Sequence, residues 1–323
     1  MKTLWLGLLV LTGCTSYEQC AEPSAASLVA LPQRLSETGL FVDAAETLGV
    51  GVHAYAPAFE LWSDGAVKRR WVQLPPGTRI DVSDAEDWRF PVGTRLWKEF
   101  VRDGVRVETR VLQRTGEADD AWVAAAYVWN DEGDAVLTPA GLENARGTEH
   151  DVPAANRCFG CHGGRKSRVL GFSALQLANS DGPFTLADAV DAGLLSDTPT
   201  AALVVPGSSE DRAMLGLLHV NCGHCHNLRR PKSAGARCFD PENKMNLLLE
   251  TDSLTTFEAT GFARTVLGHQ VKPGRADESE AFVLFSHRAP PGLFGPSQMP
   301  PLATERVDDV AVERLRAWIN ALP

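Results

Sequence analysis

Two pentapeptides in the sequence combine two cysteines and a histidine at one fixed spacing. They are Cys158-Phe159-Gly160-Cys161-His162 and Cys222-Gly223-His224-Cys225-His226. Two thiols three residues apart can form thioethers with the two vinyl groups of one haem, and the histidine that follows can then bind the haem iron. The motifs therefore predict two covalently attached haem c groups, with His162 and His226 as the proximal ligands of the two irons.

The same residue types have other uses in proteins. Closely spaced cysteines also bind zinc, form thioredoxin-like redox pairs or form structural disulfides. A histidine directly after both pairs, in a chain with export features at its N-terminus, favours haem attachment over these three alternatives. We therefore expect thioethers at Cys158, Cys161, Cys222 and Cys225.

The N-terminus predicts export. Lys2 precedes the apolar run from Leu4 to Leu11, which is too short to span a bilayer as a mature helix. The run leads into Leu11-Thr12-Gly13-Cys14, which resembles the lipobox of bacterial lipoproteins. That resemblance implies that Cys14 is lipidated and that the protein lies in the periplasm, anchored to the outer membrane. A plain secretory signal is the alternative.

Two further cysteines have no motif. Cys20 and Cys238 could form a disulfide in an oxidising compartment, but connectivity cannot be read from the sequence, so their pairing stays open.

Charge limits the partners. The 323 residues carry a net charge of −10, and nucleic-acid binding needs a surplus of basic residues, so no nucleic-acid partner is expected. An acidic surface suits a redox partner protein with a basic docking face. Membrane contact is expected only through the N-terminal lipid.

The apolar pattern changes along the chain and predicts an α+β fold. Val105, Val107, Thr109 and Val111 alternate with polar residues, which is the pattern of a half-buried strand. Six tryptophans between residues 62 and 129 are expected to form the core of this β-rich part. Apolar residues at helical spacing then predict amphipathic helices over 209–218 and 307–322.

The second haem has a candidate sixth ligand in Gln298-Met299-Pro300-Pro301-Leu302. From Ser209 to the C-terminus the chain resembles a class I c-type cytochrome, with a helix leading into Cys222, the motif, this loop and an aromatic-bearing terminal helix. In that family the methionine of such a loop binds the iron and raises its potential. The resemblance therefore implies Met299 as the sixth ligand.

No such loop lies between His162 and Cys222, so the sixth ligand of the first haem stays open. His224, between two cysteines, is expected to face solvent. An open, five-coordinate iron is the alternative to a sixth protein ligand. The candidates for that ligand are Met214, His219, His150, His53, Met245, His269 and His287.

The chain as a whole resembles a family of bacterial di-haem c-type cytochromes with a β-rich N-terminal part. The resemblance rests on the stretches 36–41, 61–71, 90–94 and 108–110, which precede the first motif. The expected divisions are a signal peptide at 1–13, a tether at 14–35, a β-rich domain at 36–150, a first haem-attachment segment at 151–205 and a class I cytochrome c-like domain at 206–323.

Three functions fit these features. The first is a non-catalytic electron carrier with two six-coordinate haems, which is what the family resemblance implies. The second is a di-haem redox enzyme of the peroxidase or oxidase type, in which the Met299 haem feeds electrons to an open first haem. The third is a binding module whose tryptophan-rich part recognises a partner. The missing ligand near Cys158 favours the second, whereas the lack of a peroxidase pattern favours the first.

Overall fold

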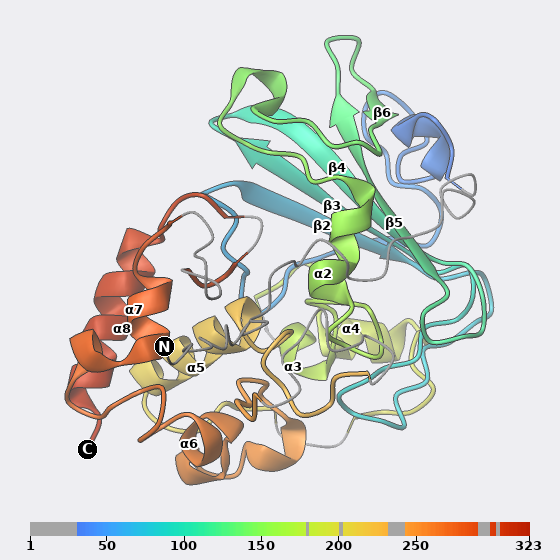
Figure 1. Cartoon of the computed structure of the whole chain (residues 1–323). Coiled ribbons are helices and arrows are strands. Elements are labelled where there is room, and N and C mark those ends of the chain that lie inside the picture. The colour runs from blue at the N-terminus through green and yellow to red at the C-terminus, as the bar shows by residue number, and fades with distance from the viewer. Residues whose placement is uncertain (1–30, 179–180, 200–202, 232–242, 290–297, 302–303) are drawn as a thin grey trace, which may run out of the picture.

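The chain folds around one antiparallel sheet flanked by short helices (Figure 1). The computed structural model describes residues 31–178, 181–199, 203–231, 243–289, 298–301 and 304–323. Within these residues the sheet has six strands in the order β1-β2-β3-β4-β5-β6, each antiparallel to the next. The strands are β1 (Val52–Tyr55), β2 (Val67–Gln73), β3 (Arg95–Arg102), β4 (Val105–Arg114), β5 (Trp122–Trp129) and β6 (Ala135–Leu137).

Side chains of each strand alternate between two covered faces of the sheet. On β3, Leu96 packs into the core on the side of the helices, whereas Trp97 packs into a second core that includes Leu35 and Leu40 of the N-terminal segment. Because both faces are covered, β3 to β5 contain few exposed residues. The expected tryptophan core is confirmed for five of the six residues: Trp71, Trp88, Trp97, Trp122 and Trp129 are buried.

Seven α-helices follow the sheet in the described part of the chain. The two longest are α5 and α8, and α5 begins after a capping box in which the Ser208 hydroxyl accepts from Asp211 N–H at 3.1 Å and the Asp211 carboxylate accepts from Ser208 N–H at 2.8 Å. The helices are α2 (Cys158–His162), α3 (Ala174–Leu177), α4 (Leu186–Asp191), α5 (Ser209–Asn221), α6 (Gly261–Thr265), α7 (Glu280–Phe285) and α8 (Asp309–Ala321).

The helical part has a core of its own. Leu215 of α5 and Leu315 of α8 are both buried in it, beside Phe262 and Phe282. Trp318 of α8 donates its indole N–H to the Asp211 carboxylate at 2.7 Å. The helices expected over 209–218 and 307–322 are thus confirmed as α5 and α8.

The sheet and the helical part are joined by specific contacts. The Asp64 carboxylate, in the loop before β2, accepts hydrogen bonds from the Thr304 hydroxyl at 2.9 Å and from Arg306 N–H at 3.0 Å. Phe59, from the same loop, packs so closely on α5 that a Cβ at Gly216 would lie 2.1 Å from its ring. The fold is therefore a mixed α+β fold, although the arrangement of α5 to α8 does not by itself identify a cytochrome c domain.

Candidate functional site

The first cysteine motif forms its own short helix against the sheet. Helix α2 carries Cys158, Cys161 and His162, and the buried Phe159 anchors it in the core on the helix side of the sheet. The two thiols are free rather than joined in a disulfide. Burial raises the pKa of Cys158 to about 11. Both thiols are thus present, unpaired and on one turn of helix, as thioether formation requires.

The loop after α2 fixes the ring of His162. Nδ1 of His162 lies 2.7 Å from the carbonyl oxygen of Arg168, so Nδ1 carries the proton and donates it to that oxygen. Arg168 adopts a left-handed conformation, with φ of 61°, which costs roughly 1 kcal/mol for a residue with a side chain. Its guanidinium donates to Gly163 O at 2.7 Å and closes the loop.

This hydrogen bond leaves the Nε2 lone pair of His162 available. Burial lowers the pKa of His162 to about 4, so the ring is neutral at pH 7. A neutral imidazole whose Nδ1–H is held by a carbonyl is the form in which histidine binds a metal through Nε2. The donor set of α2 therefore fits a haem with His162 as proximal ligand.

The second motif follows α5 without a helix of its own. Cys222 N–H donates to Leu218 O at 2.9 Å, and His226 N–H donates to Cys222 O at 2.8 Å. The two thiols are free, and burial raises the pKa of Cys222 to about 12. This motif thus continues the last turn of α5 as a series of tight turns.

His226 is held differently from His162. Its Nδ1 lies 3.3 Å from the side-chain amide nitrogen of Asn243, and Asn243 Oδ1 accepts from Met245 N–H at 2.9 Å. The amide nitrogen is then the donor and Nδ1 the acceptor. Metal ligation through Nε2 would require the proton on Nδ1, so the Asn243 side chain would have to turn if His226 were a ligand. Burial lowers the pKa of His226, so this ring also favours the neutral form.

The two motifs contact each other. The Asn227 side chain, fully buried directly after His226, donates to Gly164 O at 3.3 Å and to Gly223 O at 2.9 Å. Gly164 lies two residues after His162. The two C-x-x-C-H motifs are therefore neighbours in space, although 60 residues separate them in sequence.

A buried carboxylate also joins the motifs. Asp87, in the loop between β2 and β3, pairs with Arg165 at 3.4 Å and with Arg229 at 3.1 Å. Each arginine lies three residues after the histidine of its motif. The Asp87 side chain is 3% exposed, so this bridge is shielded from water.

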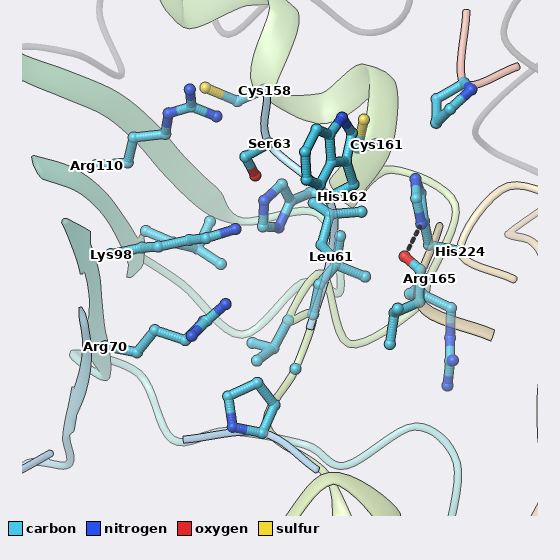
Figure 2. A pocket seen from close by; sticks show the side chains of 18 of the residues that line it. Leu61, Ser63, Arg70, Lys98, Arg110, Cys158, Cys161, His162, Arg165 and His224 are labelled. Carbon is cyan, nitrogen blue, oxygen red and sulfur yellow. Dashed lines mark hydrogen bonds between the residues drawn. The ribbon is translucent and has the colours of Figure 1, made fainter. Parts of the chain in front are cut away.

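A cavity of about 1310 Å³ opens beside α2 (Figure 2). It is larger than the roughly 300–1,000 Å³ typical of cofactor and ligand pockets. Cys158, Cys161 and His162 line it from α2, and His219 and His224 line it from the second motif and the helix before it. The cavity therefore has the size and the donors to enclose a haem.

The expectation that His224 faces solvent is wrong. Its side chain is buried, and burial lowers its pKa to about 4. Its Nδ1 lies 3.2 Å from Val220 O, the hydrogen bond dashed in Figure 2. Its position between two cysteines gave no sign of this, because the cavity that His224 lines is shared with the first motif, 60 residues upstream.

The structure separates the candidates for the sixth ligand of the first haem. Of the seven, only His150 and His219 line the cavity, and both already use a ring nitrogen. Nε2 of His150 lies 2.7 Å from the Glu108 carboxylate, and Nδ1 of His219 accepts from Leu249 N–H at 3.1 Å, which places the His219 proton on Nε2. The remaining candidates lie outside the cavity lining: Met214, Met245, His53, His269 and His287.

Three cations form a row on the sheet face that the cavity exposes. Arg70 of β2 is directly opposite Lys98 of β3, which is directly opposite Arg110 of β4. All three line the cavity and point from the sheet toward His162 (Figure 2). None was a candidate from the sequence. The sequence did offer one sign: Lys98 lies between Leu96 and Phe100 on one face of its strand, and both of these are buried. A lysine on an apolar face is unusual and points to a specific environment.

The loop of Met299 lies next to α7. Met299 N–H donates to Leu284 O at 2.7 Å, and the peptide bond to Pro300 is cis. The predicted lipidation site Cys14 and the leftover cysteines Cys20 and Cys238 lie outside the described residues.

Two kinds of feature are absent from the described residues. They contain no helix long and apolar enough to cross a membrane. They also contain no group of three or more His, Cys, Asp or Glu side chains arranged to hold a metal ion.

Comparison with known proteins gave no match. No family model matches the chain, and no curated protein or solved structure is significantly similar to it. The argument for function therefore rests on the two motifs and their surroundings.

Proposed function

We propose that the protein is a di-haem c-type cytochrome that carries electrons through two covalently attached haems. Cys158 and Cys161 would hold the first haem, with His162 on its iron. Cys222 and Cys225 would hold the second, with His226 and Met299 on its iron. The haems supply the redox chemistry, and the chain positions them, excludes water and sets their potentials.

The observation that carries this proposal is the contact between the two motifs. Free thiol pairs in C-x-x-C-H motifs suit haem attachment, and motifs joined through Asn227 and Asp87 would hold two irons near each other. A carrier needs this arrangement because electrons must pass between its redox centres. Zinc binding or disulfide formation would not require the two sites to touch.

The second candidate function is a di-haem redox enzyme with an open first haem. The cavity beside His162 favours it, because a space of about 1310 Å³ could admit a small substrate beside the cofactor. In this alternative the Met299 haem would deliver electrons to the first. The two functions differ in the coordination of one iron, which spectroscopy can distinguish.

The location and partners proposed follow from the N-terminus and the charge. A lipid on Cys14 would anchor the mature chain to the outer membrane, facing the periplasm. Its surface, with a net charge of −10 over the whole sequence, would suit a redox partner protein with a basic docking face.

The test is to express the mature chain together with a cytochrome c maturation system and to measure haem per chain. We expect two covalent haems per chain. In Met299→Ala we expect both to remain and the weak methionine-to-iron absorption band to disappear, because only the sixth ligand of the second haem is lost. Fewer than two covalent haems in the unmutated chain would contradict the proposal.

A further inference from the structure

The row of Arg70, Lys98 and Arg110 brings three basic side chains together on one face of the sheet. Like charges directly opposite each other on neighbouring strands destabilise a sheet. Arg70 pairs with Glu60 at 3.1 Å, and Arg110 pairs with Glu108, whose Oε2 accepts from Arg110 Nε at 3.0 Å. Lys98, between the two guanidiniums, has no hydrogen bond and no ion pair with any residue that the structure describes.

The surroundings of Lys98 favour its neutral amine. Burial, with the charges of Arg70 and Arg110 on either side, holds the pKa of Lys98 well below its ordinary value, and Glu108 offsets this only in part. Its Nζ lies over the Phe100 ring, 4.9 Å from the centroid. A neutral amine without a hydrogen-bond partner has a free lone pair, as a metal ligand requires.

Lys98 also has the right position. It lines the same cavity as His162. Figure 2 shows the His162 ring turned toward the sheet, with Lys98 projecting from β3 to meet it. A haem attached to Cys158 and Cys161 would lie between them, with one axial side toward His162 and the other toward β3.

The rival ligand in the cavity is His224, whose Nε2 is free because Nδ1 faces Val220 O. In Figure 2, however, His224 lies on the side of His162 away from Lys98 and the sheet. It would therefore lie behind the proximal histidine and not across the haem from it. His219 does not compete, because its Nδ1 accepts from Leu249 N–H and its Nε2 therefore carries the proton. His150 holds its Nε2 against the Glu108 carboxylate, so it could bind an iron only through Nδ1.

The geometry points to Lys98 as the sixth ligand of the first haem, bound through its Nζ opposite His162. This inference rests on the proposed function, because it needs a haem on α2. It makes the first haem six-coordinate with a nitrogen on each side, unlike the His226–Met299 pair proposed for the second. Two different ligand pairs would give the two irons different potentials. The first haem would then be a closed electron-transfer centre rather than an open catalytic one.

The experiment uses the full mature chain with its haems attached. Ferric EPR reports spin state, carbon monoxide binding to the reduced protein reports an open iron, and haem per chain is measured in every sample. The unmutated chain should show two low-spin haems and bind no carbon monoxide. Lys98→Ala should keep two haems, convert one of them to high spin and bind one carbon monoxide per chain. Adding a small primary alkylamine to Lys98→Ala should restore the low-spin signal.

Two matched variants separate ligation from charge and from general damage. Lys98→Arg keeps a cation but cannot ligate, so it should behave like Lys98→Ala. Lys68→Ala removes another lysine from the same sheet face, whose Nζ is paired with Glu60 and donates to Leu61 O, and it should leave both haems low-spin.

Several results would overturn the inference. One is a low-spin spectrum unchanged in Lys98→Ala, which would leave Lys98 as a partner of a haem carboxylate or of a bound anion. Another is a high-spin haem already present in the unmutated chain, and a third is an iron opened by His224→Ala or His150→Ala instead. In all three cases two haems per chain would keep the cytochrome proposal intact. A chain without covalent haem would overturn both.

Discussion

The two C-x-x-C-H motifs share a sequence pattern but lie in different surroundings. In the first, His162 donates Nδ1–H to Arg168 O and lines a large cavity, so its tautomer is the one that metal-binding histidines have. Around the second, His226 accepts from Asn243 and must exchange that hydrogen bond before its Nε2 can bind iron. The first site is organised by a sheet, and the second by the end of a helix.

The sixth ligands proposed for the two motifs also come from different kinds of element. For the second motif, the proposed ligand Met299 lies downstream in a loop with a recognisable pattern. For the first, the proposed ligand Lys98 lies 60 residues upstream on a strand, and only strand pairing brings it to the cavity. A short motif identifies the two cysteines and the histidine that it contains. The sixth ligand would come from whichever element the fold places across from that histidine.

The largest effect should come from removing one cysteine pair at a time. Cys158→Ala with Cys161→Ala should lower the haem content from two per chain to one and leave the methionine-to-iron band in place. Cys222→Ala with Cys225→Ala should also leave one haem but abolish that band. Pyridine haemochrome assay and absorption spectra measure both. If either double variant loses both haems, the motifs do not act as the separate attachment sites described here.

A smaller effect should follow from breaking the bridge between the motifs. Asp87→Asn removes a buried carboxylate shared by Arg165 and Arg229, and losing one partner of a buried ion pair should destabilise the fold by about 3 kcal/mol. Urea unfolding of the haem-loaded protein measures it. The control is Asp84→Asn, which also pairs with Arg229 but is 47% exposed and should cost under about 1 kcal/mol. Equal losses of stability in the two variants would contradict a buried ion-pair bridge at Asp87.

The smallest effect concerns His219, which belongs to the helix of the second motif but lines the cavity of the first. Burial, with the charge of Arg165, lowers its pKa to about 3, below the 6.5 of an unfolded histidine. The unfolded chain therefore binds more protons below pH 6.5, so this histidine costs stability as the pH falls from 6.5 toward 3.

The unmutated protein should thus lose about 2 kcal/mol more than His219→Gln between pH 6.5 and 5. Glutamine can still accept the Leu249 N–H that His219 accepts now, so the variant should fold. Urea unfolding at a series of pH values measures the difference. Parallel curves for the two proteins would mean that His219 is charged in the folded state or is not enclosed.

Much of the local structure could be predicted from the sequence. Alternation over 105–111 and helical spacing over 209–218 and 307–322 correspond to β4, α5 and α8. The two helices were predictable because each buries one stripe of its own residues, which local periodicity records. The strand was found by its alternation, but β4 is buried on both faces and not half-buried as expected. The prediction for His224 failed because His162 and Arg165 of the other motif lie near it, and no residue next to it in the sequence indicates this.

The sequence by itself determined the residue types and the spacing of the two motifs, from which haem attachment is proposed. The spacing of Cys158, Cys161 and His162, and of Cys222, Cys225 and His226, depends on single turns of backbone, and a turn is encoded locally. Only the tertiary structure decided what lies across from them. Asp87 reaches both motifs, and Arg70, Lys98 and Arg110 form one row, because an antiparallel sheet sets residues distant in sequence directly opposite each other.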